Sequence, residues 1–297
     1  MRLPDIIGVG PPRTGSTWLY NALRDSVEMP AGVKDTHFFE HFDHKGIEWY
    51  ANHFRHATGD RKIVEICPGV FFRPQARERI KQHIPDCKIV ATMRDPVDRM
   101  YSVYKLQRHY GGVGSGTLEQ VIEASPNLGG ANRYAALLES WFDSFGRENV
   151  LVTIYDELRA EPQAYLNRVC DFIGIARVTL SPRADLGSDI NSFARAPKNR
   201  RLARRATAVI DWLNSHQAYR VRTALARAGV WEFCQGRGDL YPRLTPEQDE
   251  RLRERYLPEV EALEKLLAID LSAWKKPRPA SQRDRADESR TPRVALG

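Results

Sequence analysis

The feature that most constrains the fold lies at the start of the chain, where a short apolar run leads through a loop of glycines and prolines into an amphipathic segment. The apolar run, Asp5–Val9, is typical of a buried strand, and the apolar spacing in Ser16–Asp25 predicts a helix with one buried face. A loop between a strand and a helix N-terminus directs backbone N–H groups and the positive end of the helix dipole at an anion. The start of the chain therefore predicts an α/β unit that binds a phosphate-like group.

The residues of this loop indicate which class of anion it binds. From Gly10 the spacing is G-x-x-x-x-G-S-T. The phosphate loop of nucleotide triphosphatases needs a lysine after its second glycine, where it reaches the β- and γ-phosphates. Here that position is Ser16, and a cation stands three residues earlier, at Arg13. The loop therefore favours a ligand with a single phosphate beside the reacting centre, and the alternative is a turn that merely connects strand to helix.

Further along the chain, apolar runs typical of buried strands alternate with helical patterns. This alternation predicts an α/β fold, a three-layer doubly wound parallel sheet with a P-loop-like phosphate-binding loop and a helical C-terminal part. We expect one domain over residues 1–276, a flexible loop at Gly111–Gly116, and a disordered tail over residues 277–297, where large apolar residues are few. The predicted strands are Lys62–Ile66, Lys88–Thr92 and Val150–Ile154, and the predicted helices are Pro74–His83, Val97–Arg108, Ala131–Phe145, Pro162–Ile173, Arg204–Ala228 and Pro246–Leu267.

A second candidate anion site follows the predicted strand Lys88–Thr92. Arg94 stands at the strand end, and Ser102 lies eight residues on, in the next predicted helix. A guanidinium offers two parallel hydrogen bonds to a phosphate, and a hydroxyl adds one donor. A surface salt bridge at a helix start is the alternative interpretation of this pattern.

Together the two motifs resemble those of sulfotransferases that use 3′-phosphoadenosine 5′-phosphosulfate (PAPS). Pro12–Trp18 resembles the 5′-phosphosulfate loop of that family, and Arg94 with Ser102 resembles its 3′-phosphate motif. The resemblance implies that Arg13 binds the bridging oxygen and the transferring sulfuryl group. It places Trp18 against the adenine, although a core aromatic is equally expected there. The residues that it implies at the 5′-phosphate are Thr14, Gly15, Ser16 and Thr17.

Two further stretches match the family more loosely. Tyr155 follows the predicted strand Val150–Ile154, where family members place a tyrosine that approaches the adenine. Lys198 and Arg200 lie in a basic stretch where many members close a loop over the nucleotide, so they are candidates for the 3′-phosphate. A solvated basic helix start is the alternative for this pair.

The segment after the first predicted helix, Lys34–Glu40, resembles the Glu-x-His-Phe-Phe segment of heparan sulfate 3-O-type and related carbohydrate sulfotransferases. The resemblance makes Asp35 and His37 candidates for the base that deprotonates the acceptor, and it leaves open which of them does so. The two side chains share a face only if the segment is extended. Phe38 and Phe39 are expected to line an apolar acceptor wall.

A second strand-end stretch, Lys62–Pro68, parallels a Glu-Lys-Ser/Thr-Pro stretch of the carbohydrate enzymes. Glu65 and Pro68 match, and Glu65 is expected to contact the acceptor or orient Arg13, unless it is a structural carboxylate. Ile66 replaces the lysine found there, which argues against a strict heparan-modifying enzyme.

The composition of the chain indicates which classes of ligand it can bind. The net charge of +7 fits electrostatic help for an anionic ligand, and no recognised nucleic-acid module is visible.

Five of the eight histidines fall between His37 and His56, yet the spacing matches no metal motif and aromatic residues interleave with them, so we expect no metal. The four cysteines form no CxxC pair and are expected to be free thiols. Without an apolar leader or an 18-residue apolar run, we expect no membrane span and a cytoplasmic location.

The sequence thus predicts a PAPS-dependent sulfotransferase that releases 3′-phosphoadenosine 5′-phosphate (PAP). The acceptor stays open between a carbohydrate, a lipid and a small molecule, with a hydroxyl or an amine as the reacting group. The alternatives are an atypical nucleotide kinase and a non-catalytic PAP-binding protein. The oligomeric state is not readable from the sequence.

Overall fold

The computed structural model describes residues 2–109, 117–124, 133–181, 197–216, 218–235 and 241–277. The chain divides into two compact units. The first holds Met1–Asp95 and Arg133–Ser188, and the second holds Pro96–Asn132 and Asp189–Leu296. One domain over residues 1–276 stays a prediction, and the predicted flexible loop at Gly111–Gly116 and all of the predicted tail beyond residue 277 lie outside the described residues.

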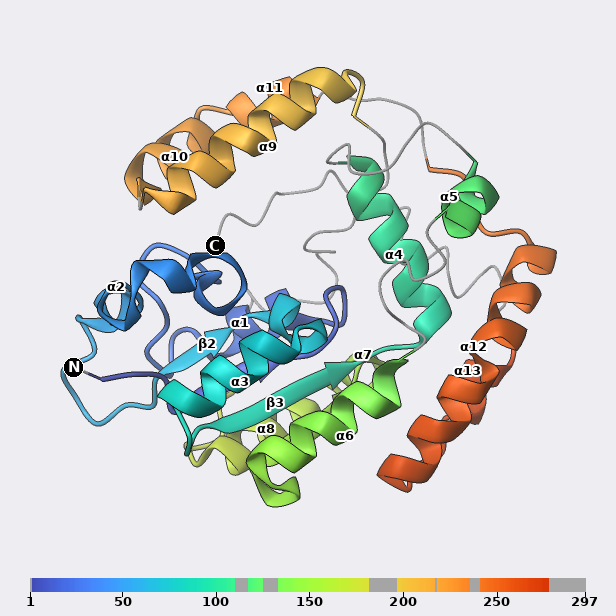
Figure 1. Ribbon diagram of the computed structural model, residues 1–297, viewed down its shortest axis with the longest axis horizontal. Helices are drawn as coiled ribbons and strands as arrows, with labels where there is room; N and C mark the ends of the chain where they lie inside the picture. Colours follow the sequence, from blue (N-terminus) through green and yellow to red (C-terminus); the bar gives the residue numbers. More distant parts are fainter. Residues whose placement is uncertain are drawn as a thin grey trace. The chain divides into compact units, whose positions relative to one another are not determined.

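The first unit is built on a four-stranded parallel sheet in the order β2-β1-β3-β4 (Figure 1). Ile6 of β1 lies opposite Val64 on one side and Lys88 on the other, and Ile89 lies opposite Val150. The parallel sheet confirms the predicted fold class. The strands are β1 (Ile6–Val9), β2 (Val64–Ile66), β3 (Lys88–Met93) and β4 (Val150–Ile154).

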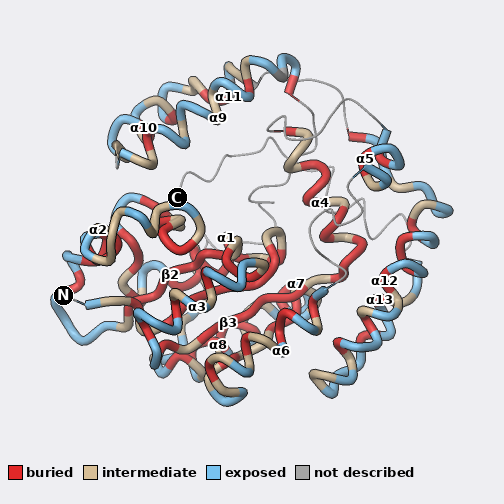
Figure 2. The backbone as a smooth tube through the Cα atoms, viewed as in Figure 1, coloured by how far each residue is buried: buried red, intermediate tan, exposed pale blue. Residues whose placement is uncertain are grey.

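Helices cover both faces of this sheet. One face packs on α1 and α8, and the shared core includes Ile6, Ile66 and Val90. The other is covered by α3 and α6, which lie in front of the sheet in Figure 1 with α8 behind it. The strands run through the most buried part of the unit, red in Figure 2. Both faces must be covered because most residues of the four strands are apolar and buried, which gives the predicted three layers.

The connections between strands position the candidate site. From β1 the chain crosses to β2 on one side of β1, and it then returns past β1 to β3 on the other side. In open α/β sheets this change of direction leaves a crevice at the carboxyl ends of the two strands, here β1 and β3. The residues that follow these ends are the loop from Gly10 to Gly15 and the segment from Arg94.

The helices mostly follow the predicted bounds, with one break. The long helix expected over Arg204–Ala228 is wrong in extent: it divides at His216 into α9 and α10, where the Ser215 hydroxyl donates to the Trp212 carbonyl. At the start of α12, the side chains of Thr245 and Gln248 form a reciprocal cap. The α-helices are α1 (Ser16–Leu23), α2 (Ile47–Ala51), α3 (Pro74–His83), α4 (Pro96–His109), α5 (Leu118–Ala124), α6 (Tyr134–Phe145), α7 (Tyr155–Ala160), α8 (Pro162–Ile173), α9 (Arg200–Ser215), α10 (Tyr219–Arg227), α11 (Val230–Gln235), α12 (Pro246–Leu267) and α13 (Ser272–Lys275). None of the helices within the described ranges is long and apolar enough to cross a bilayer.

Candidate active site

The loop after β1 is locked onto the end of β3. The Thr14 hydroxyl donates to the Pro11 carbonyl at 2.8 Å, and it lies 2.5 Å from the Thr92 hydroxyl of β3. Gly10 has φ of 117°, and a Cβ there would lie 2.5 Å from the Thr92 carbonyl oxygen. Arg13 also has a positive φ, 79°, which is uncommon for a residue with a side chain and costs about 1–3 kcal/mol. The fold therefore holds this arginine in a strained backbone conformation at the candidate site.

The end of the loop forms a cradle at the start of α1. Gly15 has φ of 100°, and a Cβ there would lie 3.0 Å from Leu158 and 3.2 Å from Tyr155, both on α7. The helix begins at Ser16, so its first N–H groups have no partner within the helix and face the loop. This arrangement is the predicted anion cradle, built at the carboxyl edge of the sheet.

Arg94 joins three of the predicted motifs. Its Nη1 donates to the Arg13 carbonyl at 3.1 Å, and its guanidinium carbon lies 4.4 Å from the centroid of the Tyr155 ring. Its Nε is buried and has no hydrogen-bond partner among the described residues. An arginine stacked on a tyrosine, with an unused buried donor, has hydrogen-bonding capacity left for an anion.

Lys34 is a site residue that the sequence did not assign. Its ammonium lies 3.1 Å from the Ser16 hydroxyl and 3.3 Å from the Thr17 hydroxyl, at the first turn of α1. Burial lowers the pKa of Lys34 to about 8, and the charge of Arg13 lowers it further while that of Asp35 opposes the shift. The absence of a lysine from the loop itself was the one sequence signal that could have directed attention to Lys34.

The segment around His37 turns sharply and gathers three ionisable side chains. His37 has a positive φ, 54°, and its N–H donates to Asp35 Oδ1 at 2.9 Å. A short π-helical turn, Phe38–Phe42, follows and brings Glu40 back toward the ring. His37 Nδ1 lies 3.6 Å from Asp35 Oδ1 and 3.3 Å from Glu40 Oε2. Asp35 and His37 therefore meet through a turn rather than along an extended segment, and Glu40 is a member that the sequence did not predict.

The electrostatics of this group decide which member holds a proton. The charge of Asp35 raises the pKa of His37 to about 9 against the opposing effect of burial, and the hydrogen bond that the His37 ring donates to Glu40 adds to the rise. Burial raises the pKa of Asp35, although the His37 charge opposes this. Burial also opposes the ionisation of Glu40, but the hydrogen bond and charge of His37 hold the pKa of Glu40 below its ordinary value. At neutral pH the His37 ring is therefore an imidazolium.

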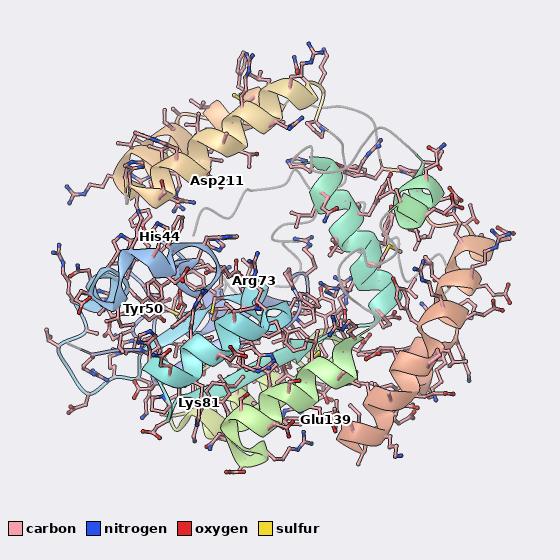
Figure 3. All side chains as sticks on the ribbon, viewed as in Figure 1. His44, Tyr50, Arg73, Lys81, Glu139 and Asp211 are labelled. Atoms are coloured by element: carbon pink, nitrogen blue, oxygen red, sulfur yellow. The ribbon has the colours of Figure 1, made fainter. Side chains whose placement is uncertain are left out.

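Glu65 lies beneath this segment and holds it in place. Its carboxyl group is fully buried, with 0% exposure. Oε1 accepts from the Thr36 N–H at 2.9 Å and from the Thr36 hydroxyl at 2.6 Å, and Oε2 accepts from the Tyr50 hydroxyl at 2.6 Å (Tyr50 is labelled in Figure 3). The expected contact of Glu65 with the acceptor or Arg13 is not what the structure shows, because both carboxyl oxygens are used inside the protein.

Replacing Glu65 should change how stability depends on pH. Burial, reinforced by the charge of Asp35, raises the pKa of Glu65 to about 7 from an ordinary value near 4.5. Between those pH values the native protein keeps a proton that the unfolded chain has released, so the free energy of unfolding falls as pH rises. From about pH 4.5 to about pH 7, the free energy of unfolding of the wild type should fall by about 3 kcal/mol relative to that of Glu65→Gln. Urea unfolding at several pH values measures both. The control is Glu78→Gln, at an exposed position of α3. If the difference in free energy of unfolding between wild type and Glu65→Gln stayed constant with pH, the raised pKa of Glu65 would be contradicted.

Three aromatic residues expected at the ligands are buried in the first unit. Phe38 and Phe39 are each 2% exposed, and Phe38 stacks on Tyr50 at 4.7 Å between ring centroids. Trp18 is 5% exposed and packs edge-on against Tyr165 at 5.6 Å. The core position of Phe38 and Phe39 differs from the expected acceptor wall, because the turn after His37 directs these rings into the protein. For Trp18 the core position is one of the two alternatives that the sequence left open.

Three other expected ligands belong to the second unit. Ser102 is buried on α4, Lys198 is exposed before α9, and Arg200 is the first residue of α9. Their part in a 3′-phosphate site stays a prediction.

The group formed by Asp35, His37 and Glu40 is also compact enough to hold a metal ion, because one ligand atom from each lies within 4.8 Å of the others. To bind a metal, His37 would have to release the proton that Asp35 and Glu40 favour, because a metal needs the neutral ring. The expectation that the protein uses no metal stays a prediction.

Comparisons with known proteins agree with this geometry. A family model described as Sulfotransferase domain matches residues 3–266. The mouse bifunctional heparan sulfate N-deacetylase/N-sulfotransferase 1 is 30% identical over 197 residues, which is 59% of this chain and 22% of that protein. The mouse heparan sulfate glucosamine 3-O-sulfotransferase 3B1 is 28% identical over 185 residues, 60% of this chain and 47% of that protein.

The matched regions are only part of those relatives, since the chain spans about a fifth to about half of their length. A solved structure covers more of the chain. The sulfotransferase from Alicyclobacillus acidocaldarius superposes with a TM-score of 0.63 at 20% identity, over 93% of this chain and 100% of that one. The fold of the chain is therefore shared with a sulfotransferase of similar extent.

Proposed function

The chain belongs to the sulfotransferase domain family, and we propose that it transfers a sulfuryl group from PAPS to a hydroxyl or amine of an acceptor. The observation that carries this proposal is the hydrogen bond from Arg94 to the Arg13 carbonyl. It joins the two predicted anion sites at one edge of the sheet, although they lie 81 residues apart in sequence.

The residues of the site fit a nucleotide with phosphates at both ends of its ribose. The Gly10–Gly15 loop and the first turn of α1 would hold the 5′-phosphate, since the first N–H groups of the helix have no partner within it. The buried Nε of Arg94, which has no partner in the part of the chain described, supports a contact with the 3′-phosphate. When bound, PAPS supplies the sulfuryl group and a good leaving group, PAP.

The chemical step is an in-line displacement. The acceptor atom forms a bond to sulfur as the bond between sulfur and the bridging oxygen breaks, and PAP leaves with that electron pair. Arg13 stabilises the charge that develops on the bridging oxygen. The acceptor loses one proton, which needs a base within hydrogen-bond reach.

Asp35 is the base in this proposal. At neutral pH the His37 ring already carries a proton, because its pKa is raised to about 9 by Asp35 and Glu40. An imidazolium cannot accept another proton, whereas the Asp35 carboxylate can. His37 holds Asp35 in position and stabilises its charge, with a separation of 3.6 Å between Nδ1 and Oδ1.

The acceptor that we propose is a glycan. Both curated relatives are named for the modification of heparan sulfate, one at an amine and one at a hydroxyl. N-desulfated heparin presents both groups, so it is the probe of choice for transfer from labelled PAPS, with the product identified by mass spectrometry. Absence of transfer to this probe, with transfer to a phenol or a lipid instead, would overturn the glycan assignment and keep the sulfotransferase.

The donor assignment is tested by Arg94→Ala. Loss of one charge-assisted phosphate contact should weaken PAP binding about 10- to 100-fold in isothermal titration calorimetry. The control is Arg168→Ala, which removes an exposed arginine paired with Glu157 and should leave PAP affinity within about two-fold. Equal PAP affinity for wild type and Arg94→Ala would contradict the 3′-phosphate site, and a wild type that binds no PAP would contradict the proposed donor.

A further inference from the structure

The phosphate loop lacks a lysine of its own, but the fold brings one to the same place. In nucleotide triphosphatases the lysine after the second glycine reaches the phosphate that is transferred. Here Ser16 occupies that position, and the Lys34 ammonium lies 3.1 Å from its hydroxyl oxygen. The same ammonium lies 3.3 Å from the hydroxyl oxygen of Thr17. Lys34 thus places a positive charge at the first turn of α1 from a separate segment, 18 residues away in sequence.

The Lys34 ammonium has hydrogen-bonding capacity left over. Among the described residues it forms no ion pair within 4.0 Å, and its two hydrogen-bond partners are neutral hydroxyls. Burial lowers the pKa of Lys34 most, the charge of Asp35 opposes this shift, and the charge of Arg13 adds to it. An ammonium has three donors, so one is left for an anionic ligand at the first turn of α1.

We propose that the Lys34 ammonium binds the oxygens of the sulfuryl group that is transferred. This inference rests on the proposed PAPS donor. The first turn of α1 holds the 5′-phosphate, so a cation beside Ser16 and Thr17 is placed for the group attached to that phosphate. The next residue along the chain is Asp35, the proposed base, so both lie in the same segment.

In this role Lys34 donates hydrogen bonds and forms no covalent bond. Its proton stays on nitrogen throughout, while the sulfur–oxygen bond to PAP breaks and the new bond to the acceptor forms. The Ser16 and Thr17 hydroxyls hold the ammonium in place before the donor binds. Because PAP has lost the sulfuryl group, Lys34 should distinguish PAPS from PAP, whereas Arg94 should act on both equally.

The test compares the binding of PAPS and PAP to Lys34→Met, which keeps the length of the side chain without its charge. We expect PAPS affinity to fall at least 10-fold and PAP affinity to change less than about three-fold, because one charge-assisted contact is lost from PAPS alone. Lys34→Arg should recover part of the PAPS affinity. Lys62→Met, which removes a lysine paired with Asp5 at the opposite end of the sheet, is the control and should change neither affinity.

The outcomes separate this inference from the proposed function. PAPS affinity that is unchanged in Lys34→Met, with normal PAP binding as proof of folding, would overturn the role of Lys34 alone. An equal loss of affinity for PAPS and PAP would also overturn it, since Lys34 would then hold the 5′-phosphate. A wild type that binds neither nucleotide would instead remove the proposed donor on which the inference rests.

Discussion

Asp35→Asn should lower kcat about 10³-fold while leaving PAP affinity within about two-fold, because general-base catalysis contributes roughly 10²–10⁴ in rate. The amide keeps the size of the side chain and its capacity to accept a hydrogen bond from the His37 N–H, now 2.9 Å from Oδ1. It removes the capacity to take a proton from the acceptor, together with the negative charge that raises the pKa of His37. Transfer from labelled PAPS to N-desulfated heparin gives kcat, and calorimetry with PAP gives the affinity.

The pH profile of the wild type checks the same assignment. Activity should rise with pH as Asp35, whose pKa is raised by burial, loses its proton. The rate at low donor concentration should fall above about pH 8 as Lys34, with its pKa lowered to about 8 by burial, loses its charge. The rising limb should be missing from Asp35→Asn. Asp43→Asn, which removes a half-exposed carboxylate paired with Arg79, is the control.

The opposite result would identify the other candidate base. If Asp35→Asn kept the wild-type kcat while His37→Ala abolished transfer, then His37 would take the proton, and its raised pKa would have to fall when the donor binds. If kcat fell 10³-fold in both variants, Asp35 would be the base and His37 would be needed to position its carboxylate.

Arg13→Ala should lower kcat about 10²- to 10³-fold, because removal of one preorganised donor from a developing charge costs about that much. Arg94 donates to the backbone carbonyl of Arg13 rather than to its side chain, so this hydrogen bond survives the substitution. PAP affinity should also fall, since the 5′-phosphate loses its nearest guanidinium. The same transfer assay and calorimetry measure both effects.

Two further variants separate the side chain of Arg13 from its strained backbone. Arg13→Gly removes the cost of the positive φ of 79°, so it should be more stable than Arg13→Ala yet equally inactive. Arg13→Lys restores a charge and should recover part of the activity. An Arg13→Ala enzyme with wild-type kcat would contradict the role of Arg13 at the leaving phosphate.

Much of the fold follows from local patterns. The strands β1, β3 and β4 are mostly apolar, and a short apolar run between turn signals is typical of a strand buried on both faces. Proline at the first helical position and glycine after the last set both ends of α8 as predicted. The short helix α7 was missed because it begins directly at the end of β4.

The site was less predictable, because its members come from distant parts of the sequence. The resemblance identified Arg13 and Arg94, but only the strand order shows that β1 and β3 are neighbours, so that one arginine can bond to the loop of the other. Glu65 was expected at the acceptor, and the structure shows instead that it holds Thr36 and Tyr50 from beneath. Its burial depends on packing that no local pattern records.

By itself the sequence determined the α/β class and the loop between β1 and α1, since these depend on neighbouring residues, and it pointed to Arg13 and Arg94 only through the family resemblance. Only the tertiary structure decided that Lys34 completes that loop and that Glu40 shares the proton of His37. Hydrogen bonds and charges act over a few ångströms in space, whatever the separation along the chain. Side chains therefore become one site only when the sheet and its turns bring them together.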